Sequence, residues 1–274
     1  MTVRLSFASL VALVAFAAPA LAEMRPTLSY SGGVGLLDMP SAEMLPDATL
    51  SVSSAHFGPV TRNTLSFQIL PRVSGSFRYS GTRGWDDVEP SKYPTYYDRS
   101  FDLRFKLTDE GKLRPAIVLG LNDIIGTGQW AGEYIAATKT FQDRVKVTAG
   151  LGWGRLGSHG AIGSIGDRPV IDYGNGGKLR LGNWFRGDVA PFAGIEWHVN
   201  DRLGLKAEYS SDAYDIESGL RQTFDRKSPF NFGVEYQLNR TTRIGASYMY
   251  GSEFGISAHF MLNPRQSPAG GLLG

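Results

Sequence analysis

Four histidines, His56, His159, His198 and His259, are the candidate catalytic bases of this chain, and Ser257 stands two residues before the last of them. A hydroxyl nucleophile needs its histidine base at hydrogen-bond distance. The Gly-x-Ser-x-Gly nucleophile motif is absent from the sequence, and no acidic residue is evident as the partner that would orient the base. We therefore expect structural histidines and no enzymatic activity.

Aromatic and acidic residues gather in three long segments, 81–97, 155–188 and 211–228. Aromatic rings can cover the apolar faces of sugars, while carboxylates accept hydrogen bonds from their hydroxyls. The alternative is ordinary packing between loops and the membrane interface. No segment has the twelve-residue spacing of a calcium loop, so we expect no metal and no cofactor. The candidate glycan-binding residues are Trp85, Asp86, Asp87, Tyr93, Tyr97, Trp184 and Tyr214.

The elements that must position these residues are strands. In the segment 100–107, Phe101, Leu103 and Phe105 alternate with Asp102 and Arg104. A period of two places apolar side chains on one face of a strand and charges on the other. Such segments recur from residue 49 to residue 262 with a length of about 9–11 residues, which a tilted strand needs to cross a bilayer. Strands in globular proteins are usually shorter.

This pattern predicts an all-β fold, a transmembrane antiparallel up-and-down β-barrel of about twelve strands. Tight turns alternate with long loops, and an even strand number places both termini in the periplasm. A soluble periplasmic β-sandwich would show the same alternation. Strand length, aromatic residues near strand ends and the turn asymmetry favour the barrel. The predicted strands are 48–57, 60–70, 72–80, 98–107, 113–122, 129–141, 144–154, 189–199, 203–212, 229–238, 242–251 and 253–263.

Across these strands, charges of both signs lie on the face opposite the apolar residues. In a barrel this face lines the lumen, where the charges either pair with one another or form a polar path for a sugar chain. Closure also brings the first and last strands together, and with them His56, Ser257 and His259. The predicted lumen charges are Asp102, Arg104, Lys106, Glu133, Lys139, Glu196, Lys206, Glu208 and Glu235.

Residues 1–22 have the features of a cleavable signal peptide. Arg4 precedes an apolar run, and a small-x-small site ends at Ala22. The chain has no cysteine, so we expect neither disulfides nor a lipidated N-terminus. A net charge of only +2 argues against nucleic acid as a partner. The mean hydropathy of −0.17 suits a barrel with a polar lumen.

The chain is therefore expected to comprise four parts. A signal peptide covers 1–22, a periplasmic lead-in or plug segment 23–47, the outer-membrane barrel 48–263 and a flexible tail 264–274. The glycine-rich stretch 32–40 lies in the lead-in. Because it joins no strand to a helix, it predicts a turn-rich segment and not a phosphate-binding loop.

Several blocks of sequence resemble the YjbH family of exopolysaccharide-associated outer-membrane proteins. The resemblance covers most of residues 32–214. The blocks are GLLDMPSA at 35–42 with LPD at 45–47, LPR at 70–72, GSFRY at 75–79, DRSFDL at 98–103, GTG at 126–128, EY at 133–134, GLGWGRLG at 150–157, WFRG at 184–187 and LKAEY at 205–209.

The resemblance implies an outer-membrane barrel that is accessory to the export or assembly of exopolysaccharide or capsule. Its implied partners are outer-membrane lipid, a polysaccharide and periplasmic assembly proteins. Family members are typically longer, with a second C-terminal portion that we expect this chain to lack, and some resemble lipoproteins. Two alternatives stay open: a lipid- or glycan-modifying hydrolase, and a purely structural or adhesin-like barrel.

Overall fold

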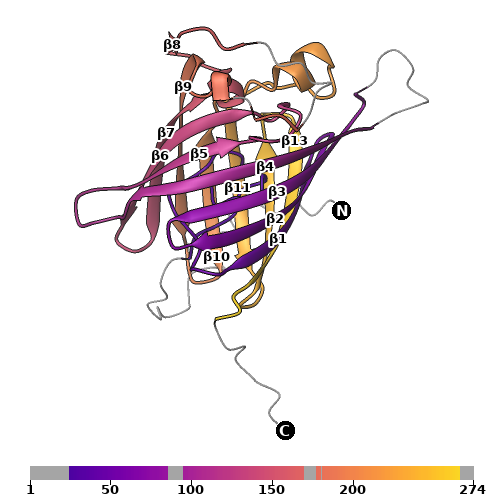
Figure 1. Cartoon of the computed structure of the whole chain (residues 1–274). Helices are drawn as coiled ribbons and strands as arrows, with labels where there is room; N and C mark the ends of the chain where they lie inside the picture. Colours follow the sequence, from indigo (N-terminus) through magenta and orange to yellow (C-terminus); the bar gives the residue numbers. More distant parts are fainter. Residues whose placement is uncertain (1–24, 86–94, 170–176, 180, 266–274) are drawn as a thin grey trace, which may run out of the picture.

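The computed structural model describes residues 25–85, 95–169, 177–179 and 181–265, and twelve of its strands form a closed antiparallel barrel (Figure 1). The fold therefore confirms the predicted twelve-stranded barrel. The strands of the ring are β1 (Leu50–Phe57), β2 (Val60–Leu70), β3 (Val73–Arg83), β4 (Thr95–Thr108), β5 (Ala116–Asn122), β6 (Gly132–Phe141), β7 (Val145–Trp153), β9 (Gly187–His198), β10 (Leu203–Tyr209), β11 (Phe230–Gln237), β12 (Thr242–Met249) and β13 (Glu253–Leu262).

Neighbours in sequence are neighbours in the ring, and β1 pairs with β13 as expected from closure. The predicted and observed strands agree closely, and β2 has the predicted bounds. One short strand was not predicted. It is β8 (Gly163–Ile165), which extends the sheet beside β9.

The connections also contain short helical turns: η2 (Gly154–Gly157), η3 (Leu181–Asn183) and η4 (Asp215–Leu220). No helix in the described part of the chain combines the length and apolar composition needed to cross a bilayer.

The outer face of the ring is an apolar belt. Phe101 and Leu107 of β4 are exposed, whereas Asp102 and Arg104 between them are buried. Ile195, Leu205, Val234 and Ile256 are outward-facing examples from other strands. A closed barrel with this belt has no unpaired strand edge, and its exposed face suits the hydrocarbon of a membrane.

The two ends of the barrel differ, as the alternation of loops predicted. We call them the short-turn end and the loop end. The loop end carries the connections 123–131 and 210–229 and the described parts of the connections after β3 and β7, at the top of Figure 1. Two connections at this end are nevertheless tight, 58–59 and 250–252. Gly58 and Gly251 have positive φ angles there, which glycine adopts without strain.

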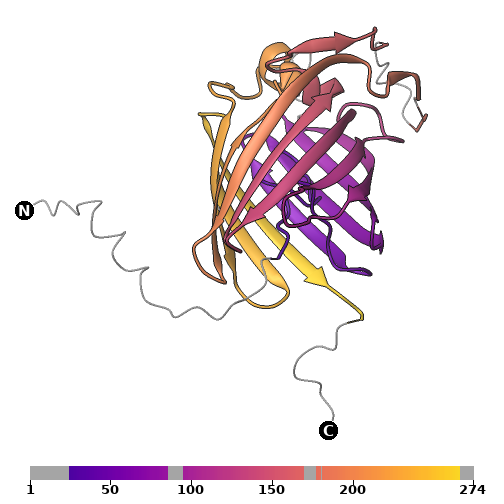
Figure 2. The same ribbon diagram turned by 90° about the vertical axis from the view of Figure 1, so that its left-hand side faces the viewer.

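The interior is filled by the described part of the predicted lead-in, residues 25–47, which we call the finger. It runs inside the ring in Figure 2. Leu36, Met39 and Ala42 of the finger pack against Val118, Tyr134 and Phe192, which the strands direct inward. Both ends of the finger lie at the short-turn end, because the side chains of Lys146 and Arg243 contact its first residues and Lys146 also contacts Glu43.

Candidate functional site

The tip of the finger is a tight turn at residues 35–40. The amide of Leu36 donates to the carbonyl of Met39 at 2.9 Å, and Gly35 and Pro40 form a β-bridge. A side chain at Gly35 would stand 2.6 Å from the Met39 carbonyl, so the turn needs glycine at this position. This turn presents the side chain of Asp38 at the tip.

Three wall residues hold the Asp38 carboxylate. Arg62 of β2 lies 2.6 Å from its Oδ1. The hydroxyls of Tyr214 and Tyr250 each donate to its Oδ2 at 2.6 Å. Asp38 and Arg62 are both buried, and buried charges of this kind require such pairing. The three donors come from β2, from the 210–229 connection and from the turn after β12.

Glu208 of β10 holds the backbone of the same tip. Its carboxylate accepts the amides of Leu37, Asp38 and Met39 at 2.9–3.1 Å. Asn231 of β11 donates to it at 2.7 Å. Charge-assisted bonds to a carboxylate are stronger than neutral ones, so Glu208 orients the turn.

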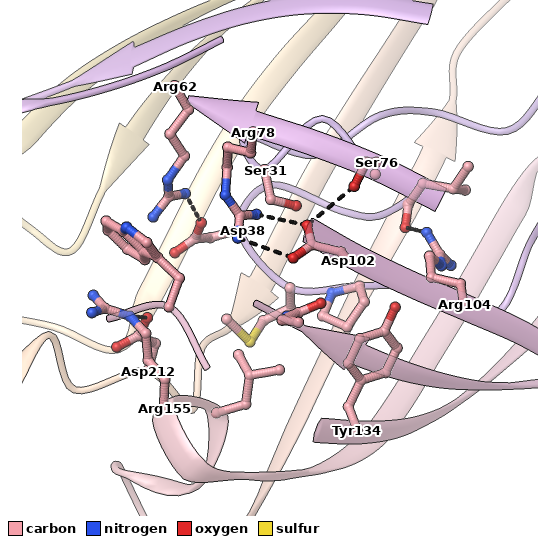
Figure 3. Close-up of a pocket in the computed structure, with 17 residues that line it drawn as sticks. Ser31, Asp38, Arg62, Ser76, Arg78, Asp102, Arg104, Tyr134, Arg155 and Asp212 are labelled. Atoms are coloured by element: carbon pink, nitrogen blue, oxygen red, sulfur yellow. Dashed lines mark hydrogen bonds and ion pairs between the residues drawn. The ribbon is translucent and has the colours of Figure 1, made fainter. Parts of the chain in front are cut away.

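Cations of the wall hold the carbonyl groups of the finger. Arg104 donates to the carbonyls of Val34, Ser41 and Glu43. Figure 3 shows Arg104 beside the pocket. Lys206 donates to the carbonyl of Leu36 at 3.0 Å while pairing with Glu235 at 2.6 Å. Both cations are buried. The wall therefore satisfies finger groups that would otherwise be desolvated without partners.

The 210–229 connection closes over the tip. Its Asp212 and Glu217 pair with Arg155 at 2.6 and 2.9 Å. The ring of Trp130 stands between two guanidinium groups, 4.4 Å from that of Arg62 and 4.0 Å from that of Arg155. Burial raises the pKa of Asp212 to about 6, because the carboxylates of Asp38 and Glu217 add to the burial and together outweigh Arg155.

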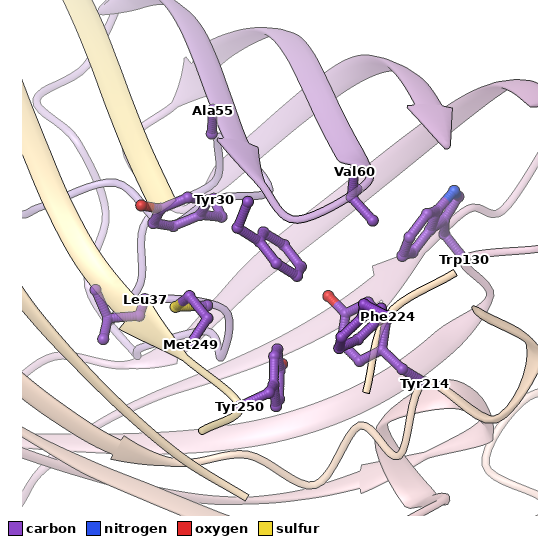
Figure 4. Packing of buried hydrophobic residues seen from close by; sticks show 10 residues of the cluster. Tyr30, Leu37, Ala55, Val60, Trp130, Tyr214, Phe224, Met249 and Tyr250 are labelled. Carbon is purple, nitrogen blue, oxygen red and sulfur yellow. The ribbon is translucent and has the colours of Figure 1, made fainter. Parts of the chain in front are cut away.

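Aromatic side chains line the same end of the interior. Phe57, Tyr214, Phe224 and Tyr250 form a cluster of mostly edge-on ring contacts with Tyr30 of the finger (Figure 4). Tyr214 has a left-handed backbone conformation, with φ +53°, which turns its side chain into this cluster. Beside the tip remains a cavity of about 50 Å³, lined among others by Asp38, Arg62, Arg78, Asp102 and Arg104 (Figure 3).

Most predicted lumen charges lie inside the barrel. Asp102, Arg104, Glu196, Lys206, Glu208 and Glu235 are buried on the inner face. Lys106 shares that face but stands near the short-turn end, where it pairs with Asp109 at 2.8 Å.

Two of the predicted lumen charges lie on the outer face instead. In β6 the inward positions are those of Tyr134, Ala136 and Thr138, so Glu133 and Lys139 point outward. Glu133 is buried because the 154–186 connection covers it and supplies Arg168 at 2.7 Å. Lys139 pairs with Glu110 at the short-turn rim. The prediction was wrong because β6 carries small residues on both faces, Ala136 and Thr138 inward and Ala137 outward, so its alternation does not mark the inner face.

The candidate glycan-binding residues do not form one site. The rings of Trp85 and Tyr96 stack with centroids 4.6 Å apart, and Tyr97 is exposed and stacks on Tyr79. Trp184 borders a small cavity with Asp123 and Asn183. Asp86, Asp87 and Tyr93 lie outside the described residues.

Tyr214 corrects the prediction for its position. The residue is fully buried, and its hydroxyl bonds to Asp38. Its ring is therefore not a loop surface for a sugar while the finger is in place.

Among the candidate serine and histidines, His56 faces the opposite side of the wall from Ser257 and His259. His56 points outward and shares a hydrogen bond with Thr61 at 2.9 Å. Ser257 and His259 point inward, and His259 is buried against Ser53 at 2.9 Å. The three residues share a neighbourhood, as closure predicted, but not a face.

The residues that sequence reasoning missed are Asp38, Arg62 and Arg155. Arg62 has the same strand phase as Thr64 and Ser66, opposite Leu65, so its inward direction was readable. Asp38 and Arg155 lie outside strands, where no period exists. Among the described residues, no cluster of three metal-ligating side chains was found.

Comparison with known proteins identifies the family. A family model described as "Exopolysaccharide biosynthesis protein YbjH" matches residues 27–272. The chain belongs to the YjbH family. The "Uncharacterized lipoprotein YjbH" of Escherichia coli strain K12 is 32% identical over 244 residues, which cover 85% of this chain and 34% of that protein. This YjbH-family chain thus spans about a third of the length of that relative.

Solved outer-membrane barrels share only the general architecture with this YjbH-family chain. The NanC porin matches with a TM-score of 0.40 and 9% identity, over 77% of this chain and 98% of the porin. The KdgM porin in complex with disordered oligogalacturonate matches with 0.41 and 7%, over 77% and 98%. The outer-membrane phospholipase of Salmonella typhi matches with 0.36 and 12%, over 81% and 92%.

Proposed function

We propose that this outer-membrane barrel is a non-enzymatic accessory of exopolysaccharide or capsule assembly or export. The observation that carries the proposal is the family match over residues 27–272, in a chain whose lumen is filled by the finger. A filled lumen suits a controlled passage or binding chamber better than an open pore. Periplasmic assembly proteins would then meet the short-turn end, which carries both ends of the finger.

The loop end is the proposed glycan-facing surface. Trp85 stands beside Tyr96, and the guanidinium of Arg221 lies 5.5 Å from its ring. Trp184 stands beside the carboxylate of Asp123 and the amide of Asn183. Rings next to polar groups suit sugars, which have apolar faces and hydroxyl edges.

A polysaccharide-output assay in a deletion strain tests the proposal. Complementation by the unaltered gene should restore output, and the pair Trp85→Ala with Trp184→Ala should restore several-fold less. This several-fold loss is expected because each lost aromatic contact weakens sugar binding by roughly 0.5–1.5 kcal/mol. A correctly folded barrel must be confirmed for each variant by its heat-dependent migration on gels.

The matched pair is Ser257→Ala with His259→Ala, which removes the serine and the histidine considered as nucleophile and base on the inner face and also the His259 contact to Ser53. A non-enzymatic accessory should retain its output in this variant. Loss of output here, with normal output from the tryptophan pair, would replace the proposal with a hydrolase. Normal output from the deletion strain itself would refute the exopolysaccharide role.

A further inference from the structure

The receptor around Asp38 is built by the wall, whereas the carboxylate that it holds belongs to the finger. Arg62 and the two phenols of Tyr214 and Tyr250 converge on this one group at 2.6 Å each. Arg62 also donates to the Tyr214 hydroxyl at 2.7 Å, which fixes the two donors relative to each other. The wall therefore carries a preformed carboxylate receptor.

The remaining wall contacts to the finger also recognise groups that are not specific to a polypeptide. Arg104 and Lys206 donate to carbonyl oxygens, and Glu208 accepts three hydrogen bonds from amides. Ring oxygens and hydroxyls of a sugar chain offer the same acceptors and donors. The rings of Trp130 and Tyr250 border the receptor, and the Trp130 ring packs against the guanidinium of Arg62 (Figure 4).

Withdrawal of the finger from the lumen would leave the strand pairing of the barrel intact. Both ends of the finger are at the short-turn end, where Lys146 contacts the carbonyl of Arg25 at 3.2 Å and Glu43 at 2.8 Å. Withdrawal therefore needs no passage through the loop end. The ring closes through β1–β13 and β9–β10 pairing, which does not involve the finger.

We infer that the finger occupies an internal binding site for a carboxylate-bearing polysaccharide, with Asp38 in the place of a uronate carboxylate. The polymer enters from the short-turn end when the finger withdraws, and its carboxylate binds Arg62, Tyr214 and Tyr250. This inference rests on the proposed function and names the substrate class.

Binding of a uronic-acid octasaccharide to the purified full-length barrel tests the inference, with a glucose octasaccharide of equal length as the uncharged control. Asp38→Ala removes the competing carboxylate, so it should bind the acidic sugar at least about tenfold more tightly than the unaltered chain. Adding Arg62→Gln to this variant should weaken binding about tenfold. The glucose octasaccharide should respond to neither change.

A lock on the finger supplies a second test in the unaltered receptor. The Ala42 amide lies 2.8 Å from the Thr138 hydroxyl, so Ala42→Cys with Thr138→Cys can join the finger to β6 in this cysteine-free chain. The reduced form should bind the acidic sugar and the oxidised form should not.

Equal binding of both sugars by Asp38→Ala, insensitivity to Arg62→Gln, or equal binding by the locked and reduced forms would each overturn the inference. Polysaccharide output from the deletion strain is independent of these results. If the chain restores output but shows no preference for the acidic sugar, the proposed function stands and the internal carboxylate site is refuted.

Discussion

At the scale of single residues, burial and neighbouring charges set the pKa of an aspartate at the loop end. Asp123 follows β5 with φ +54°, and its Oδ2 accepts the amides of Gly128 and Trp130 at 2.8 and 3.1 Å. Its Oδ1 is buried, and no hydrogen bond to it is found within the described residues. Burial raises the pKa of Asp123 to about 7, and the nearby Asp98 carboxylate contributes.

Asp123→Asn tests whether the raised pKa of Asp123 makes the stability of the barrel depend on pH. The pKa of this carboxyl is 3.8 in the unfolded chain and about 7 in the folded chain. Between these two pH values the folded state is protonated and the unfolded state is not. Stability therefore falls as pH rises through this window, by up to about 4 kcal/mol, and is level above it. Asparagine should remove that fall, measured by urea unfolding in detergent at several pH values.

The exposed turn residue Asp201 supplies the control for this measurement. Asp201→Asn should leave the pH dependence of the unaltered chain in place. An Asp123→Asn variant with the same pH dependence as the unaltered chain would show that Asp123 is already ionised without cost in the fold.

At the scale of elements, each strand of the ring has one face toward lipid and one face toward the interior, which the finger fills. Leu103 and Leu107 are on the outer face of β4, with Leu107 close to the short-turn end. Asp102, next to Leu103, pairs with Arg78 at 3.2 Å and accepts the amide of Asp123 at 2.8 Å. The charges of the inner face are thus paired with one another, which is one of the two arrangements that the sequence predicted.

Leu103→Arg should destabilise the barrel by about 2–4 kcal/mol, because it places a charge near the middle of the apolar belt. Leu107→Arg, the same change on the same face of the same strand, should cost about 0–1 kcal/mol near the rim. Folding into lipid vesicles followed by urea titration measures both. Equal losses for the two variants would contradict the assigned depth of the belt.

The finger is held in the lumen by contacts with the wall, and Glu208 makes several of them at the tip. Glu208→Ala should free it, because three buried amides of the tip lose their acceptor. Ala42 is fully buried and the chain has no cysteine, so Ala42→Cys reports on the finger. We expect a polar maleimide to label this cysteine at least about tenfold faster in the Glu208→Ala background.

Glu253→Ala is the matched control for that experiment, since Glu253 lies at the start of β13 with its side chain beside Gly58, in the tight turn at the loop end. It should leave labelling slow. Fast labelling of Ala42→Cys in the otherwise unaltered chain would mean that the finger leaves the lumen spontaneously.

As a whole molecule, the chain is a closed barrel whose outer face suits lipid and whose inner face binds the finger. Residues far apart in sequence meet at the tip, where Asp38 contacts Arg62, Tyr214 and Tyr250. The barrel, the finger and the 210–229 connection are therefore coupled through one carboxylate. Movement of either segment removes hydrogen bonds from the other.

The whole-molecule prediction concerns location and assembly. The mature protein should fractionate with the outer membrane and migrate faster on gels before heating than after it, because a closed barrel resists detergent. Fractionation with markers of the periplasm and of both membranes measures this. Recovery as a soluble periplasmic protein would contradict the membrane assignment of the apolar belt.

The period of two was sufficient to predict the ring from the sequence. Strand direction, strand number, the apolar belt and the meeting of the first and last strands all follow from local alternation and from the need to close every edge. Glu133 and Lys139 show the limit of this period, since they lie on the outer face of β6, where small residues on both faces leave the alternation unclear.

Only the tertiary structure decided what fills the lumen. The segment 25–47 has no period, and its hydrogen bonds go to groups as distant as Glu196, Glu208 and Tyr250. Contacts of this kind depend on the three-dimensional position of each strand and leave no spacing in the sequence. Local alternation therefore determined the barrel, whereas the binding chamber inside it arises from long-range pairing of buried charges.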